Sequence, residues 1–187
     1  VTHEGNPKNN EIKEYCKRFS FIKIIEIPVY ASLCKARNIG ILNCDRDYIV
    51  MCTDDLIFSP GWLDNLIDIW NKNPEAQIIS LTNFACWGLH ISLILDIGYW
   101  DEGFRGLDFD DIDYGIRLSE AEIPFYSIEN LNLVEHEHSG IKYLFEENKK
   151  HFSSKWSNKV SYRSHGETRR TAFETDFYPE FTKKLRE

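Results

Sequence analysis

Apolar and polar positions alternate along this chain with two different periods, which predict helices and strands in turn. Apolar residues three or four positions apart predict amphipathic helices, and short runs rich in β-branched and aromatic residues predict strands. The expected helices cover residues 9–19, 33–42, 62–70 and 111–121, the expected strands cover 21–29, 47–52, 76–82 and 123–134, and residues 89–97 fit either. Because strands and helices alternate, we expect an α/β domain with a largely parallel central sheet.

Two adjacent carboxylates stand where one of these strands ends. Asp54 and Asp55 follow the apolar run 47–52, which predicts a buried core strand. Ligands of open α/β sheets bind beyond the carboxyl ends of the strands. Carboxylates at such a place lose hydration unless a cation or hydrogen-bond donors meet them. A divalent metal ion is therefore the expected partner of this pair.

A denser acidic cluster surrounds the start of the predicted helix 111–121. Helix capping explains one of its carboxylates, because an acid at a helix start accepts hydrogen bonds from unpaired N–H groups. The others need a second role, such as metal binding, orientation of a sugar hydroxyl or proton abstraction. An EF-hand is excluded because the loop lacks the required glycine and final glutamate. The cluster consists of Asp101, Glu102, Asp108, Asp110, Asp111 and Asp113.

Two histidines, His136 and His138, add possible metal ligands. Side chains alternate along an extended strand, so both would lie on one face. Imidazole together with carboxylates suits Mn²⁺ or a similar divalent ion, whereas structural zinc would need the cysteine pair that the sequence lacks. A structural role would explain a single histidine better, but a pair that follows two acidic clusters favours metal binding.

Composition narrows the classes of function. The 187 residues suffice for one domain with a substantial core, and the net charge of -8 argues against nucleic-acid and anionic membrane partners. No apolar run has transmembrane length, and the start lacks a signal-peptide pattern, so we expect a soluble segment. Five cysteines without a Cys-x-x-Cys pair predict free buried thiols in a reducing, cytoplasmic compartment. Dinucleotide, P-loop and serine-hydrolase motifs are absent from the sequence.

Taken in order, these pieces resemble glycosyltransferase family 2, the nucleotide-sugar-dependent enzymes of the GT-A fold. Each fragment is weak alone, but their order and spacing extend over most of the chain. The matching segments are 36–40, 47–49 leading into 53–55, 59–63, 98–104, 110–118, His136 or His138, and 148–156.

The resemblance implies a Rossmann-like GT-A fold with a mixed, mainly parallel central sheet, and roles for individual residues. In the family, an Asp-x-Asp element holds a metal ion that bridges the donor diphosphate, and Thr53-Asp54-Asp55 stands in its place with threonine for the first acid. A later acidic motif supplies the base that deprotonates the acceptor. The implied site has Asp111 as the base, Asp55 with His136 and His138 as metal ligands, His3, Glu4, Arg37, Asn38 and Asp54 at the donor, and Trp100, Asp101, Glu102 and Asp110 at the acceptor.

The resemblance also implies an activity. We expect transfer of a sugar with inversion from a nucleotide-sugar, a UDP-sugar in our interpretation, to a carbohydrate acceptor, assisted by Mn²⁺ or Mg²⁺. Two alternatives stay open: a non-catalytic GT-A-like module that binds a glycan or nucleotide, suggested by Thr53, and a metal-dependent phosphohydrolase.

The start of the chain resembles the family's second strand, so we expect either an excerpt without the usual first strand and helix or an unusual opening. Residues 1–147 are predicted to form the GT-A-like domain. Residues 148–187, which are rich in lysine and arginine, are predicted to form a basic extension.

Overall fold

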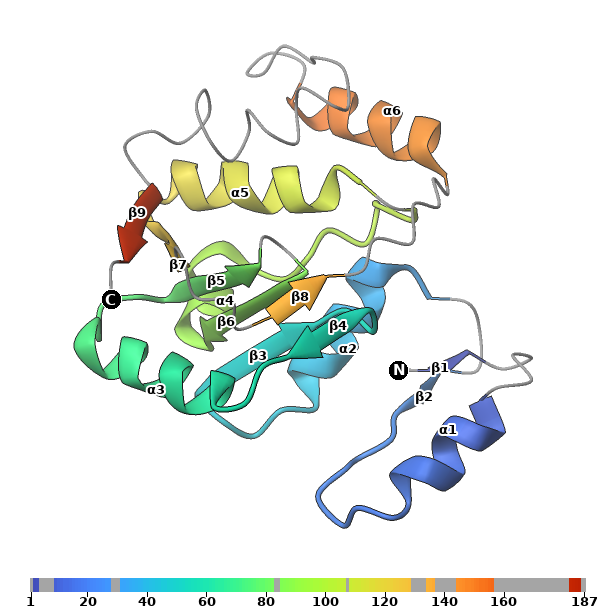
Figure 1. The fold of residues 1–187 in the computed structure, drawn as a ribbon. Helices are drawn as coiled ribbons and strands as arrows, with labels where there is room; N and C mark the ends of the chain where they lie inside the picture. The colour runs from blue at the N-terminus through green and yellow to red at the C-terminus, as the bar shows by residue number, and fades with distance from the viewer. Residues whose placement is uncertain are drawn as a thin grey trace.

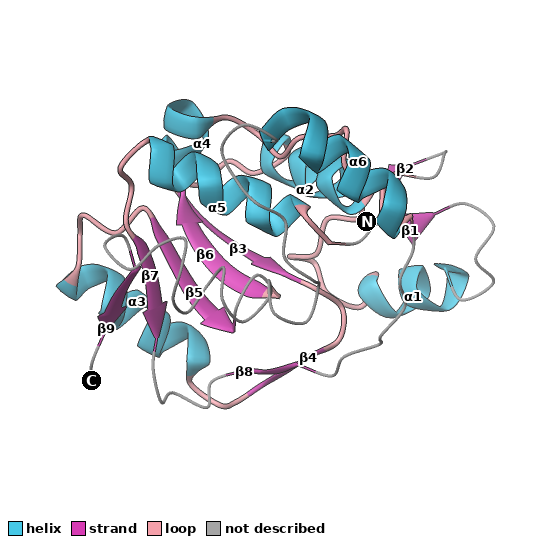
Figure 2. Ribbon diagram, turned by 90° about the horizontal axis from the view of Figure 1, so that it is seen from above, coloured by secondary structure: helices cyan, strands magenta, loops and turns pink. Residues whose placement is uncertain are grey.

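A computed structural model describes residues 2–3, 9–27, 31–82, 85–106, 108–128, 134–136, 144–156 and 182–185. Its centre is a five-stranded sheet with the order β3-β6-β5-β7-β9 (Figure 1). Helices cover both faces of this sheet (Figure 2), so the predicted α/β class with a mixed sheet flanked by helices is confirmed. The strands are β3 (Tyr48–Cys52), β5 (Ile78–Thr82), β6 (Cys86–His90), β7 (Phe125–Ile128) and β9 (Thr182–Leu185).

The sheet is less parallel than predicted. β6 runs antiparallel to both of its neighbours, β3 and β5, whereas β7 runs parallel to β5 and β9. β5 and β6 are antiparallel because only residues 83–85 separate them, too few for the crossover that parallel neighbours need. The periodicity within a strand carries no information about its direction, so the pattern could not reveal this hairpin.

The helices lie close to their predicted positions. α2 (Leu33–Leu42) matches its predicted range, and the Ser32 side chain caps it by accepting a hydrogen bond from the Lys35 N–H at 3.3 Å. Residues 89–97 divide between the end of β6 and α4 (Ser92–Ile97). None of the helices in the described part of the chain is long and apolar enough to cross a membrane. The others are α1 (Asn9–Cys16), α3 (Trp62–Lys72), α5 (Asp110–Glu120) and α6 (Phe145–Trp156).

Two hydrophobic clusters form the core, one on each face of the sheet, because side chains alternate along a strand. On β5, Ile78 belongs to the larger cluster and Ile79 to the smaller one. The larger cluster receives side chains from α2, α4, α5 and α6, and the smaller one receives Leu66 and Trp70 from α3. Gly88 of β6 lets the Trp70 ring pack against the strand, since a Cβ atom at that position would collide with the ring.

β3 is less buried than the core strand predicted for residues 47–52. Within the described residues it pairs on one side only, with β6. Ile49 is buried, whereas Tyr48 and Cys52 at the two ends are exposed. A short apolar run does not distinguish a central strand from one at the edge of a sheet, which explains the difference.

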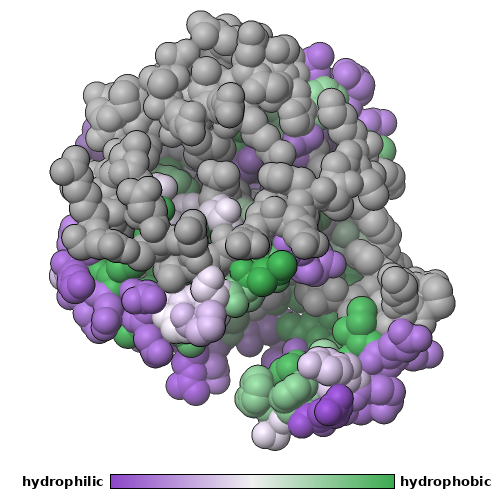
Figure 3. Space-filling view, in the orientation of Figure 1, coloured by the Kyte–Doolittle hydropathy of each residue, from purple (hydrophilic) through white to green (hydrophobic). Residues whose placement is uncertain are grey.

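Two small sheets accompany the central one. β1 (Thr2–His3) pairs in parallel with β2 (Glu26–Ile27), and β4 (Leu56–Phe58) pairs antiparallel with β8 (Val134–His136). The predicted strand 21–29 is thus confined, in the part described, to β2. The segment around α1 exposes the apolar side chains of Ile12, Tyr15 and Phe21 (Figure 3, lower right).

α6 crosses the predicted boundary between residues 147 and 148. Its Phe152 and Trp156 belong to the larger cluster, together with Phe104 and Phe109 of the loop before α5. This helix is therefore part of the same hydrophobic core as the sheet. The division into a domain and a basic extension stays a prediction.

Candidate active site

The turn between β3 and β4 carries Asp54 and Asp55, at the strand end where the sequence places them. The Thr53 N–H donates to the Ala85 carbonyl oxygen at 2.9 Å, and the Thr53 hydroxyl donates to the same oxygen at 3.5 Å. These contacts join the turn to the segment that opens β6. Asp54 is exposed and Asp55 is half-buried, so the turn presents one carboxylate to solvent and holds the other partly inside.

β8 brings a predicted metal ligand next to this turn. In the β4–β8 ladder, His136 pairs with Leu56, the residue that follows Asp55. The backbones at Asp55 and His136 are therefore close, although the two positions are far apart in the sequence. His138 and Glu4 lie outside the described residues, and His3 is placed only as part of the β1 backbone. The ligand roles of these residues stay predictions.

The loop before α5 has a backbone that α6 holds in place. Asp108 and Phe109 have φ angles of 72° and 70°, in the left-handed region that side chains other than glycine rarely adopt. The buried Asn148 of α6 donates from Nδ2 to the Asp108 carbonyl at 2.9 Å. Its Oδ1 accepts hydrogen bonds from the N–H groups of Arg105 at 2.9 Å and Gly106 at 3.1 Å. One side chain thus fixes the path by which the chain enters α5.

Asp113 of α5 is the centre of a buried ion network. Its carboxylate is fully buried, with 0% of the residue exposed. Lys155 Nζ lies 2.6 Å from Oδ1, which also accepts a hydrogen bond from Trp156 Nε1 at 2.9 Å. Arg117 Nε donates to Oδ2 at 3.0 Å. These three donors compensate for the hydration that the carboxylate loses on folding. Because two of the donors belong to α6, Asp113 links α5 to α6.

The other two acids in the first turn of α5 have different surroundings. Asp110 is buried and pairs with Arg37 at 2.5 Å. Asp111 is half-buried, and its Oδ1 accepts the N–H of Ile112 at 2.9 Å. The N-cap position belongs to Phe109, which makes no side-chain cap, so none of these acids caps the helix from that position. Of the three acids in this turn, Asp111 is the most accessible to solvent.

Arg37 and Asn38 have partners within the protein. Arg37 pairs with Asp110, whose implied acceptor contact stays a prediction. Asn38 is 5% exposed; it donates to the Trp100 carbonyl at 2.9 Å and to Glu102 Oε1 at 3.0 Å, and accepts the Trp100 N–H at 2.9 Å. These contacts support the acidic loop, and the predicted donor contacts of Arg37 and Asn38 stay predictions.

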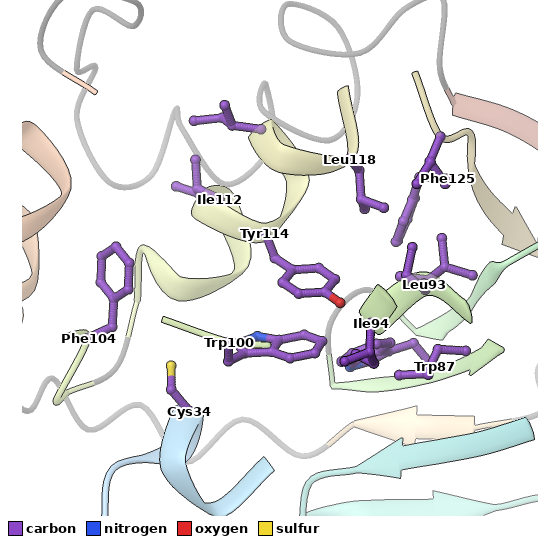
Figure 4. Close-up of a cluster of buried hydrophobic side chains, with 14 of the residues drawn as sticks. Cys34, Trp87, Leu93, Ile94, Trp100, Phe104, Ile112, Tyr114, Leu118 and Phe125 are labelled. Carbon is purple, nitrogen blue, oxygen red and sulfur yellow. The ribbon is translucent and has the colours of Figure 1, made fainter. Parts of the chain in front are cut away.

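Trp100 is a core residue and not a platform for the acceptor. Its indole stacks on the Tyr114 ring with a centroid distance of 3.6 Å and an interplanar angle of 9°, and the Trp87 ring lies 4.7 Å away (Figure 4). The residue is 2% exposed, so it offers no face to a sugar. In the sequence, an aromatic residue beside acids is typical of a core position and of a binding position alike. Only its burial in the structure distinguishes these two roles.

Asp101 is held by α6, and Glu102 beside it is exposed. Asp101 Oδ2 lies 3.0 Å from His151 Nε2 and 2.8 Å from Lys155 Nζ, and Oδ1 accepts the Gly103 N–H at 2.8 Å. A Cβ atom at Gly103 would collide with the His151 ring, which explains the glycine of Asp-Glu-Gly-Phe. Burial raises the pKa of Asp101, but hydrogen bonds from Lys155, Gly103 and His151 outweigh it and hold that pKa well below its ordinary range. The acceptor roles of Asp101 and Glu102 stay predictions.

The stability of the fold should decrease in acid because of Asp101. A carboxyl group with a lower pKa in the folded chain stabilises the fold above its unfolded pKa of about 3.9, and the contribution is lost as the pH falls toward the folded value. We expect Asp101→Asn to lower the midpoint of urea unfolding near pH 7 and to lower it less as the pH is brought down to 2. Asp68→Asn, at an exposed acid of α3, is the control. An equal loss at both pH values would contradict this linkage.

Sequence reasoning assigned no role to the α6 residues that hold the acidic segments. Asn148, His151 and Lys155 recur at spacings of three and four, the signal of a single helix face. That periodicity shows that they share a face, but not what the face contacts. The acid partners of His151 and Lys155 are about fifty positions away in sequence.

The two acidic regions lie toward the same end of the molecule. In Figures 1 and 2, the turn that follows β3 and the first turn of α5 both lie at the carboxyl end of β3. Among the side chains that the structure describes, no three from His, Cys, Asp and Glu gather as a metal site. The arrangement therefore offers carboxylates from two elements at one end of the molecule.

Comparison with known proteins finds one family model that matches part of the chain. A search of curated proteins finds no match. The sequence model described as "Glycosyl transferase family 2" matches residues 9–89, a segment that includes α1, α2, the Asp54–Asp55 turn and β5. The family supports glycosyltransferase activity in general, with a nucleotide-sugar donor and an acceptor. The resemblance inferred from the motifs is thus confirmed over residues 9–89, where this chain is similar to family 2 glycosyltransferases.

Proposed function

We propose that this protein transfers a sugar, with inversion, from a UDP-sugar to a carbohydrate acceptor, and that a divalent metal ion assists the reaction. Asp55 and His136 bind the metal ion, Asp54 contacts the donor, and Asp111 is the base. The family match supports a glycosyltransferase in general. The choice of metal, nucleotide and base is our own inference.

The pairing of β4 with β8 is the observation that carries this proposal. It sets His136 opposite Leu56 and hence beside Asp55 in the backbone. A carboxylate oxygen and an imidazole nitrogen suit Mn²⁺, and the backbone positions of Asp55 and His136 are neighbours just after β3, next to the exposed Asp54. The β4–β8 pairing therefore brings the backbone of the His136 segment next to the Asp54–Asp55 turn, although the two are about 80 positions apart in the sequence.

The residues present fit a metal ion that the donor shares. Mg²⁺ and similar ions in nucleotide sites are commonly held by one or two protein carboxylates together with substrate phosphates. Asp55 and His136 would supply two ligands, and diphosphate oxygens and water the rest. Such an ion neutralises the negative charge that develops on the departing diphosphate. The Thr53 hydroxyl is directed to the Ala85 carbonyl, so it does not replace the family's first acid as a ligand.

Asp111 is placed to act as the base. Its carboxylate lies in the first turn of α5 and is the most accessible of the three acids there. As the acceptor oxygen attacks the anomeric carbon, its proton passes to Asp111, and the bond between that carbon and the diphosphate oxygen breaks. Asp110 and Asp113 are buried and each pairs with a cation from another helix, so the helix offers Asp111 for this step.

Binding of the donor should depend on the metal ion and on Asp55. We expect a UDP-sugar to raise the melting temperature of the protein in the presence of Mn²⁺ and to have little effect in EDTA, because a ligand that binds only the native state stabilises it. Asp55→Asn should abolish this shift. Asp68→Asn, which alters an exposed acid on α3 away from the turn, should retain it. A thermal-shift assay over a panel of nucleotide-sugars, with and without Mn²⁺, makes this measurement.

The other outcomes separate the alternative functions. Metal-linked binding without release of UDP, for any donor tested with an acceptor panel, would support a binding module in place of an enzyme. Release of phosphate from nucleotides without sugar transfer would support a phosphohydrolase. A shift that persists in EDTA, or in Asp55→Asn, would contradict the metal site.

A further inference from the structure

We propose that Cys52 and Cys86 form a reversible disulfide bond next to the Asp54–Asp55 turn. Cys52 is the last residue of β3 and Cys86 the first of β6, and the two lie opposite each other in the ladder. Their Sγ atoms are 3.7 Å apart, and both are free thiols in this structure. The inference does not rest on the proposed function, because it concerns the two sulfur atoms alone.

The register of the ladder favours such a bond. The Thr53 N–H donates to the Ala85 carbonyl, which marks Thr53 and Ala85 as a hydrogen-bonded pair. Pairs alternate along antiparallel strands, so Cys52 and Cys86 form a non-hydrogen-bonded pair, in which Cα atoms are about 4.5 Å apart and the side chains are closest. Disulfides span Cα distances of about 4.4–6.8 Å. The bond therefore requires rotation of the side chains and little movement of the backbone.

The two thiols differ in exposure, as a stepwise thiol–disulfide exchange requires. Cys52 is exposed and can meet a soluble oxidant, whereas Cys86 is fully buried behind it. The hydrogen bond from Cys86 lowers the pKa of the Cys52 thiol, and the same bond together with burial raises the pKa of Cys86. Attack should begin at Cys52, since the thiolate is the reactive form. The sequence predicts buried thiols throughout, but Cys44 and Cys52 are exposed.

The oxidant that we name is a low-molecular-weight disulfide such as oxidised glutathione. The Cys52 thiolate attacks one of its sulfurs, forms a mixed disulfide and releases one glutathione thiolate. Cys86 then loses its proton and attacks the Cys52 sulfur, which forms the protein disulfide and releases the second glutathione. Two protein thiols are oxidised and one glutathione disulfide is reduced to two thiols, so electrons and protons balance. A reducing dithiol reverses both steps.

Peptide mapping of the full chain tests the bond directly. Trypsin cuts after Arg46, Lys72 and Arg105, which places Cys52 and Cys86 on separate peptides without any other cysteine. After the folded protein reacts with oxidised glutathione, we expect a cross-linked pair of these peptides, a mass about 2 Da below the sum of the two. Reduction should restore both. The yield should exceed that of the urea-unfolded chain on the order of tenfold, because the fold holds the two sulfurs together.

Single substitutions supply the controls. Cys86→Ser should stop the reaction at the mixed disulfide on Cys52, and Cys44→Ser, at an exposed cysteine outside the pair, should leave the cross-link unchanged. Circular dichroism before and after oxidation shows that the chain stays folded. Persistence of the mixed disulfide in the parent protein would overturn the proposal, as would a cross-link from Cys52 to Cys44 or equal yields in the folded and unfolded chains.

Discussion

Asp111→Asn is expected to lower the rate of sugar transfer by about 10²- to 10⁴-fold, the range that a positioned general base supplies. Asparagine keeps the size of the side chain but does not accept a proton. Because Asp111 is half-buried and its backbone lies in a helix held by buried contacts, we expect no large change in the fold. Release of UDP from the donor in the presence of acceptor measures the rate.

The same variant should still bind the donor. We expect Asp111→Asn to show the melting-temperature shift of the parent protein with Mn²⁺ and the nucleotide-sugar, since the proposed metal and donor contacts come from the β3–β4 turn and β8 and not from α5. Glu120→Gln, at the exposed far end of the same helix, is the control and should transfer sugar at the parent rate. Full turnover in Asp111→Asn would show that another group takes the proton.

Asp113→Ala is expected to lower the free energy of unfolding by about 3–5 kcal/mol, the cost of removing one partner from a buried ion pair. The substitution leaves Lys155, Arg117 and the Trp156 indole N–H without the carboxylate that they share. Water would not replace the carboxylate at the Trp156 indole, because Trp156 is buried, whereas Lys155 keeps its contact with Asp101. Urea unfolding, read as the midpoint and slope of the transition, measures the loss.

Asp68→Ala is the matched control for Asp113→Ala, because it removes the same group from an exposed position on α3. Its effect should be within about 0.5 kcal/mol. Lys155→Met should destabilise the fold less than Asp113→Ala does, since Arg117 still pairs with Asp113. A loss below about 1 kcal/mol for Asp113→Ala would show that the network contributes little to stability.

Local periodicity predicted most of the elements but not their arrangement. α2 has its predicted bounds, and the strand before Asp54 ends where expected. The direction of β6, the edge position of β3 and the pairing of β4 with β8 depend on contacts between distant segments. Such contacts leave no mark in the spacing of apolar residues within one element, so they could not be predicted from it.

The candidate site shows the same limit. The sequence indicated a cluster of acids but did not tell the accessible Asp111 from the buried Asp110 and Asp113. Those differences come from partners on α2 and α6, and the partner of Asp110 lies 73 positions away. Trp100 likewise was expected to contact the acceptor, whereas its ring is buried against Tyr114 and Trp87. Composition gives the chemistry available at a site, whereas long-range packing decides which groups reach a ligand.

The contacts of α6 have a consequence for local unfolding. Asn148 holds the backbone of the acidic loop, and Lys155 contacts both Asp101 and Asp113. Segments joined by such buried contacts open together as one cooperative unit. Amide hydrogens in the loop and in the first turns of α5 should therefore exchange with solvent at the same free energy as those of α6. The motion that exposes Asp111 further would be an opening shared by two helices and not a movement of the loop alone.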